Sequence, residues 1–107
     1  MLIFSIWPMI MGIGVIIGTS LCANGRIKPN YFIGIRLPQV MKTEQTWEAG
    51  HTAAMFPVTV GGMLAVVIGL GTELIPAIGI AGPILALVSV LVGLAWAVTR
   101  ALAATKP

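Results

Sequence analysis

The sequence contains three long stretches without a formal charge, at residues 2–23, 52–70 and 77–99. As an α-helix, the 22 residues of the first stretch would be about 33 Å long, enough to cross a hydrocarbon core of about 30 Å. Lipid offers no hydrogen-bond partners, so a spanning segment must satisfy its own backbone groups, and a helix does so. The sequence therefore predicts an all-α membrane protein with three transmembrane helices in one domain, residues 1–107.

The composition excludes the main classes of soluble protein. Charged residues make up 8% of the chain and hydrophobic residues 58%, which leaves too few charges to cover a surface in water. The net charge of +3 therefore indicates orientation in a membrane, and no nucleic-acid partner is expected. A single cysteine, Cys22, and a single histidine, His51, provide neither a metal site nor a cofactor site. Because no span holds a charged residue, we expect neither an enzyme nor a transporter.

Polar residues separate the three stretches and set the expected helix ends. Asn24-Gly25 should end the first helix, because either residue accepts the left-handed conformation found at helix C-termini. Residues 24–43 then form a loop in which no regular element is expected. Thr43 should cap a second helix, whose first residues, 44–51, extend beyond the membrane. A turn at residues 71–73 should lead into the third helix.

The basic residues are distributed unevenly about the three spans. With three crossings, the first loop and the C-terminus lie on one side, and every Lys and Arg falls there. The opposite side holds only Glu73 and the N-terminal amine. The positive-inside rule therefore predicts a cytoplasmic loop, a cytoplasmic C-terminus and an external N-terminus. The six basic residues are Arg26, Lys28, Arg36, Lys42, Arg100 and Lys106.

The loop and the second helix contain an ordered set of residues: Pro29-Asn30, Gly34-Ile35-Arg36, Pro38, Glu44, Trp47, His51 and Gly61-Gly62. This set resembles the SdpI family of small bacterial membrane proteins. Leu37 stands where that family usually has Thr, and Thr52 follows the His where a basic residue is common. The resemblance implies a multi-pass protein of the bacterial plasma membrane. It is similar to the C-terminal half of the best-known member, which protects its host from a secreted peptide toxin and holds a repressor at the membrane.

The same segment supplies the candidate binding site. Gly34 and Pro38 restrict the backbone on either side of Arg36, so its guanidinium should be held in a fixed direction. We expect Arg36 to pair with Glu44 or Glu48, directly or through a lipid phosphate. The side chains at 44, 47, 48 and 51 share one face of the second helix. The candidate partner-binding residues are Asn30, Arg36, Glu44, Trp47 and His51.

Simpler roles exist for the same residues. The basic residues of the loop can serve only to set the topology, with binding of anionic lipid as a secondary effect. Trp47 can be an anchor at the membrane interface, and His51 can be a hydrogen-bonded interface residue.

Small residues recur at four-residue spacing in all three spans. Such faces let helix backbones approach closely in lipid, where packing drives association. They can join the three spans to one another, or to partner helices in a second copy or a larger complex. The helix-packing candidates are Gly14 and Gly18 in the first span, Gly61, Ala65 and Gly69 in the second, and Ser89, Gly93 and Ala97 in the third.

Two functions are compatible with these features. The first is a non-catalytic membrane protein of SdpI type, which binds a peptide, a regulator or lipid at its cytoplasmic face and other helices through its spans. The alternative is an accessory subunit of a larger membrane complex, such as a respiratory supercomplex, that fills helix interfaces and holds lipid.

Overall fold

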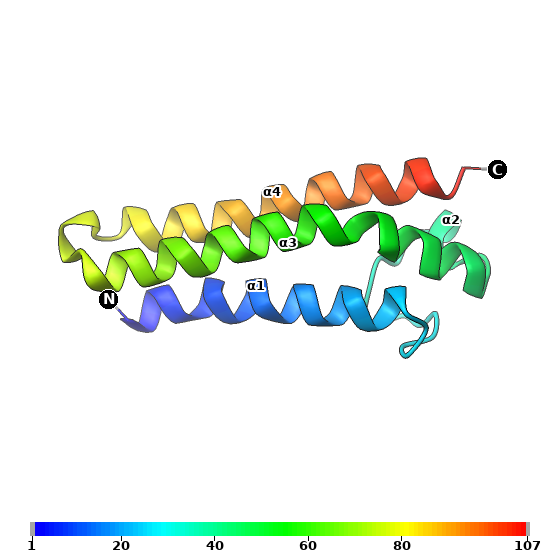
Figure 1. Cartoon of the computed structure of the whole chain (residues 1–107), viewed down its shortest axis with the longest axis horizontal. Coiled ribbons are helices and arrows are strands. Elements are labelled where there is room, and N and C mark those ends of the chain that lie inside the picture. Colours follow the sequence, from blue (N-terminus) through cyan, green and yellow to red (C-terminus); the bar gives the residue numbers. More distant parts are fainter. Residues whose placement is uncertain (1, 107) are drawn as a thin grey trace.

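The computed structural model describes residues 2–106, and these form an all-helical bundle (Figure 1). Its long helices are α1 (Leu2–Ala23), α3 (Glu44–Leu74) and α4 (Ala81–Ala104). All three are long and apolar enough to cross a membrane, which confirms the expected all-α fold with three candidate spans. The bundle measures 49 × 22 × 18 Å, so it exceeds the roughly 30 Å hydrocarbon core at its ends.

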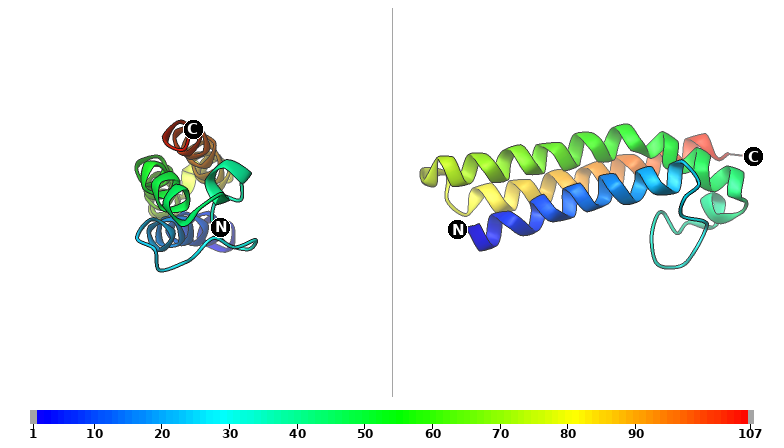
Figure 2. Two further views of the ribbon diagram at one scale, coloured as in Figure 1. Left: turned by 90° about the vertical axis from the view of Figure 1, so that its right-hand side faces the viewer. Right: turned by 60° about the horizontal axis from the view of Figure 1, so that its bottom comes forward.

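Helix α3 lies at the centre of the arrangement and packs against both α1 and α4, whereas α1 and α4 make few contacts with each other. Both neighbours run antiparallel to α3 (Figures 1 and 2). Residues 24–43 and the end of α4 lie together at what we call the loop end. The start of α1 and the connection from α3 to α4 lie at the other end, the turn end.

Glycine pairs set the distance between the helices. A Cβ atom on Gly61 would lie 2.6 Å from the Ser89 carbonyl oxygen and 3.0 Å from the Gly93 Cα, so α3 and α4 meet backbone to backbone. The Ser89 hydroxyl donates a hydrogen bond to the Gly61 carbonyl at 3.1 Å. On the other side of α3, a Cβ on Gly12 would lie 2.8 Å from the Gly62 carbonyl oxygen. These approaches bring side chains of adjacent helices into contact in lipid.

The remaining small residues of the three spans occupy different environments. Ala65 and Ala97 are fully or almost fully buried between α3 and α4. Gly69 faces α1, where an added Cβ would meet the side chain of Met9. In contrast, a Cβ on Gly14 would meet nothing within 4 Å, and one on Gly18 would meet only Ile33, at 3.9 Å. The Gly14–Gly18 face of α1 is thus not used to pack the bundle.

The connection between α3 and α4 differs from the expectation. Residues 71–73, expected to form a turn, lie inside α3, where the Thr72 hydroxyl donates to the Ile68 carbonyl at 2.8 Å and packs against Gly82. The chain reverses later, through the short 3-10 helix η1 (Pro76–Ile78) and Gly79, whose φ is +64°. Consequently α4 begins at Ala81 instead of residue 77.

The helix ends at the loop end follow local chemistry. At the end of α1, Gly25 has a φ of +81° and the Arg26 amide donates to the Leu21 carbonyl at 2.9 Å, which confirms the expected stop. At the start of α3, the Thr43 hydroxyl accepts from the Thr46 amide at 3.0 Å, which confirms the expected cap. The loop was expected to contain no regular element, but it includes a one-turn helix, α2 (Pro38–Met41). Pro38 is the first residue of this helix, a position that proline favours.

Candidate functional site

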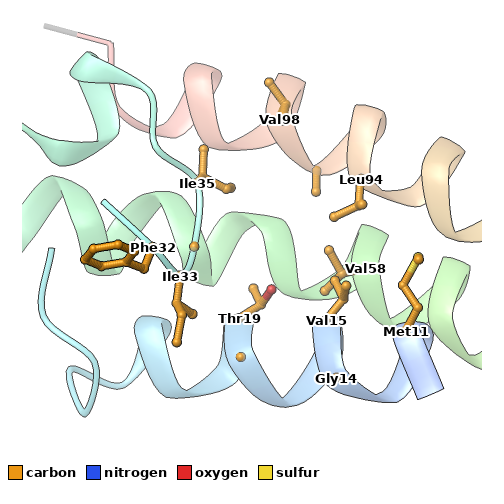
Figure 3. A pocket seen from close by; sticks show the side chains of 13 residues that line it. Met11, Gly14, Val15, Thr19, Phe32, Ile33, Ile35, Val58, Leu94 and Val98 are labelled. Carbon is orange, nitrogen blue, oxygen red and sulfur yellow. The ribbon is translucent and has the colours of Figure 1, made fainter. Parts of the chain in front are cut away.

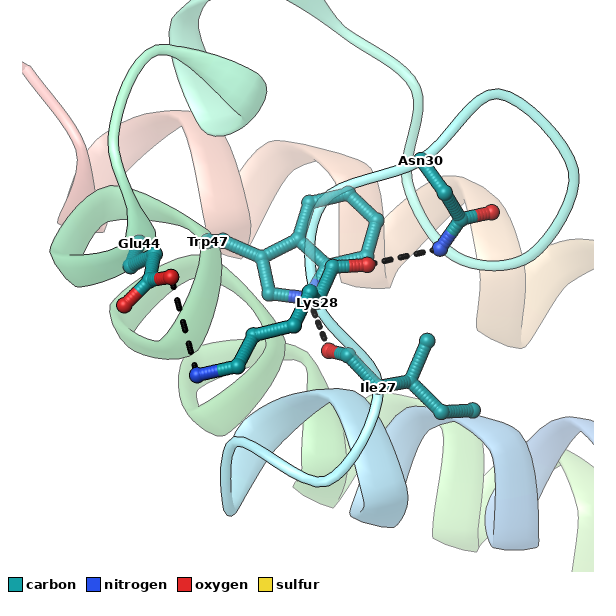
Figure 4. A network of polar contacts seen from close by, with 5 residues as sticks. All are labelled: Ile27, Lys28, Asn30, Glu44 and Trp47. Atoms are coloured by element: carbon teal, nitrogen blue, oxygen red, sulfur yellow. Dashed lines mark hydrogen bonds and ion pairs between the residues drawn. The ribbon is translucent and has the colours of Figure 1, made fainter.

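The first part of the loop is folded by the side chain of Asn30. Its Oδ1 atom accepts from the amides of Phe32 and Ile33, each at 2.8 Å, and its Nδ2 donates to the Lys28 carbonyl at 2.7 Å. Figure 4 shows the last of these bonds. An asparagine that bonds its neighbouring backbone in this way closes a tight turn without help from a regular element. Asn30 therefore shapes the loop from within.

Trp47 ties the start of the loop to α3. Its indole nitrogen donates to the Ile27 carbonyl at 2.8 Å, and the side chain is fully buried (Figure 4). It packs in a cluster to which all four α-helices contribute, with Cys22 of α1, Val40 of α2 and Ala101 of α4. The side chain is thus the centre of the apolar packing at the loop end.

His51 holds the second part of the loop. Its Nε2 accepts from the Ile35 amide at 2.9 Å, and its Nδ1 lies 2.7 Å from the Trp47 carbonyl oxygen. A backbone amide can only donate, so Nε2 must carry the lone pair, and the ring proton then lies on Nδ1, which donates to Trp47. These two contacts assign a neutral imidazole with a defined tautomer. The side chain is fully buried, 4.3 Å from the Trp47 ring between centroids.

Gly34 lets the loop lie directly on these two rings. Its φ is +103°, and a Cβ atom there would come within 2.7 Å of the Trp47 ring and 2.8 Å of the His51 Nε2. Only glycine satisfies both the backbone angle and the lack of space. Trp47, His51 and Gly34 together form what we call the loop clamp.

The charged residues pair differently from the expectation. Arg36 donates from Nη1 to the Tyr31 carbonyl at 2.8 Å, within the loop. Glu44 instead forms an ion pair with Lys28 at 3.6 Å (Figure 4), the one ion pair among residues 2–106. The expected direct pairing of Arg36 with Glu44 or Glu48 is therefore wrong. The pairing with a glutamate is disfavoured because the Tyr31 carbonyl is closer along the chain. A backbone acceptor also requires no second side chain to be ordered.

The outer surface of the loop is aromatic and basic. Tyr31 is 76% exposed and Phe32 is 89% exposed, beside the exposed Arg36. The sequence analysis did not single out these two aromatic residues. The signal that identifies them is an aromatic pair in a basic loop next to a span, the composition of a membrane interface.

Gln39 is a second residue that the sequence analysis missed. Its Nε2 donates to the Leu102 carbonyl at 2.8 Å and to the Thr105 hydroxyl at 2.9 Å. It thereby adds a side-chain donor to one carbonyl and one hydroxyl in the last turn of α4. No local pattern in the sequence indicates this contact, because its partners lie more than sixty residues along the chain.

A sequence model of the SdpI/YfhL protein family matches residues 26–100, from the loop to the last turns of α4. The chain belongs to the SdpI/YfhL protein family. This membership confirms the resemblance found in the loop and the second helix, and extends it through the third. No curated protein and no solved structure gives a significant match.

Family membership and the three apolar helices together indicate a multi-pass membrane protein. The residues that carry the SdpI/YfhL resemblance have a physical role in this chain. Asn30, Gly34, Trp47 and His51 bind the loop backbone or give it space, and Arg36 closes it with a further hydrogen bond. Within residues 2–106, the His, Cys and Glu side chains form no group of three or more that could hold a metal ion.

Proposed function

We propose that this SdpI/YfhL protein is a non-catalytic binding protein of the bacterial plasma membrane, whose loop binds a peptide, a regulator protein or lipid at the cytoplasmic face. One observation carries the proposal. The two largest fully buried side chains, Trp47 and His51, each direct one ring nitrogen to the backbone of an exposed loop. Burial of polar groups is costly unless they are hydrogen-bonded, and here the loop backbone supplies those partners, so the loop and α3 are tied together.

An ordered loop is useful for binding because less conformational entropy is lost when a partner docks. The side chains that the clamp leaves outside, Tyr31, Phe32 and Arg36, combine aromatic area with a planar cation. Aromatic residues and arginine dominate the energetics of protein interfaces. Trp47 and His51 themselves are buried, so in this proposal they support the surface and do not touch the partner.

A photoreactive residue in place of Phe32, in the native membrane, tests the proposal. We expect illumination to give one discrete adduct, because a preorganised surface selects one partner. The same residue in place of Phe56, which is 64% exposed on α3, serves as the control for random contact with bulk lipid. The adduct at 32 should disappear in a His51→Ala background. Identical products at 32 and 56 would overturn the proposal.

The proposed cytoplasmic position of the loop can be tested separately. All six basic residues lie at the loop end or beside it, so we expect this end to stay inside the cell. In Phe32→Cys, a membrane-impermeant thiol reagent should label the protein only after the membrane is opened. The wild-type chain is the control, since its one cysteine, Cys22, is fully buried. Labelling of intact cells would reverse the orientation.

The alternative function, an accessory subunit of a larger membrane complex, has one observation in its favour. The Gly14–Gly18 face of α1 resembles a helix-docking surface and has little opposite it in the chain. Co-purification in mild detergent of a stable complex that dissociates in Gly14→Leu would favour this alternative.

A further inference from the structure

A groove runs between α1 and α4, where these two helices make few contacts (Figure 3). Its volume is about 390 Å³, within the range of ligand pockets. Gly14 and Gly18 form one wall, Leu94 and Val98 of α4 form the other, and Val58 of α3 lies between them. Thr19 contributes the one polar side chain of the lining, so the groove suits a hydrocarbon occupant.

The loop covers the groove at the loop end. Phe32, Ile33 and Ile35 line this end of it, and the Asn30 turn and the His51 contact hold these residues in place (Figure 3). A partner helix that continued past the loop end would meet this cover. A flexible hydrocarbon chain that ends inside the groove would not meet the cover.

The charges around the cover indicate the other half of the occupant. Arg36 directly follows the lining residue Ile35 in the chain. Its guanidinium donates to the carbonyl of Tyr31, the residue that precedes Phe32. Six basic residues lie at or near the loop end, against two acidic ones, Glu44 and Glu48. An apolar groove that continues into a cationic rim is complementary to an amphiphile with a negative head.

We propose that the groove holds one acyl chain of an anionic phospholipid whose phosphate binds at Arg36. This inference rests on the proposed binding function and names the ligand for its lipid form. The planar donor fork of arginine suits a phosphate. The glycine wall gives the acyl chain room along α1. The residues of the loop that cover the groove, held by the loop clamp, close over the part of the acyl chain nearest the loop end.

Native mass spectrometry of the full chain in detergent, titrated with dioleoyl phosphatidylglycerol, tests the proposal. We expect one retained lipid per chain, with weaker retention of dioleoyl phosphatidylcholine and no retained inorganic phosphate. Arg36→Gln should weaken binding about fivefold, the typical effect of one interfacial charge. Gly14→Leu should weaken it at least about tenfold, because the added side chain displaces methylene groups from the groove.

Two matched variants serve as controls. Gly71→Leu makes the same change in α3, at a site where an added Cβ also meets nothing within 4 Å, and should not affect binding. Arg26→Gln removes an exposed loop arginine that does not border the groove, and should have a smaller effect than Arg36→Gln.

Three results would overturn the inference. These are equal lipid retention in wild type and Gly14→Leu, equal affinity for the two lipids, or a wild-type dimer that Gly14→Leu converts to a monomer. The last would assign the groove to a second copy of the chain. The proposed binding function has its own test, since a peptide or regulator adduct at position 32 would stand even if no lipid were retained.

Discussion

Replacing Gly61 with leucine should separate α3 from α4 and destabilise the bundle by about 3 kcal/mol or more, at the upper end of the usual cost of overpacking. The reason is geometric. The atoms that an added Cβ would meet at 2.6 and 3.0 Å, on Ser89 and Gly93, belong to the backbone, so no side chain can rotate away. The helices must move apart, which also breaks the Ser89–Gly61 hydrogen bond.

Thermal unfolding in detergent, followed by circular dichroism, measures this effect. We expect the Tm of Gly61→Leu to fall by about 10 °C or more. The control is Gly71→Leu, an identical change in the same helix at an open position, which should stay close to wild type. An unchanged Tm in Gly61→Leu would mean that α3 and α4 do not pack through this glycine.

The second large effect is expected from His51→Ala, which should release the loop while leaving the three-helix bundle folded. Without the imidazole, the Ile35 amide has lost its acceptor, a cost of about 1–3 kcal/mol for a buried group. Hydrogen exchange should show the Ile35 amide exchanging at least about tenfold faster than in wild type, a factor that corresponds to roughly 1.4 kcal/mol. Amides in the middle of α3 should keep their protection.

His51→Gln provides the matched variant, because its side-chain oxygen can accept the Ile35 amide and does not titrate. Its exchange rate should lie closer to wild type than that of His51→Ala. In the wild type, protonation would place a second N–H on the imidazole, where the Ile35 amide donates. Loop protection, expressed relative to the intrinsic exchange rate at each pH, should therefore fall at acid pH in wild type and stay constant in His51→Gln. Equal exchange in all three proteins would show that His51 does not hold the loop.

The parts of this fold that follow from short segments could be predicted from the sequence. The three helices could be expected because an uncharged stretch long enough to cross a bilayer has few alternatives. The stop at Gly25 and the cap at Thr43 depend on a few neighbouring residues each, and both lie where their chemistry places them. The helical conformation of residues 71–73 does not follow from the local sequence, because Gly71 has a weak helix propensity. Burial of Thr72 against Gly82 outweighs that preference.

The parts that depend on contacts between distant residues could not be predicted. The regular spacing of Gly14 and Gly18 indicated a packing face, whereas α1 packs through Gly12, which is rotated away from them. The roles of the candidate-site residues likewise depend on contacts between residues that are distant in the sequence. The sequence marked Trp47 and His51 as important, but their burial makes them supports for the loop. The partner of Arg36 also depends on the loop turn made by Asn30, which no pattern of charges reveals.

The bond from Gln39 to the end of α4 has a consequence for how the protein is made. Leu102 and Thr105, the acceptors of that bond, leave the ribosome more than sixty residues after Gln39. Ala101, which completes the packing around Trp47, also follows it in the chain by most of α3 and α4. Chains emerge from the N-terminus at about 5–20 residues per second, so the loop must wait several seconds for its final contacts. The surface that we propose for binding therefore matures only after α4 has been made, and a nascent chain without α4 would lack these contacts.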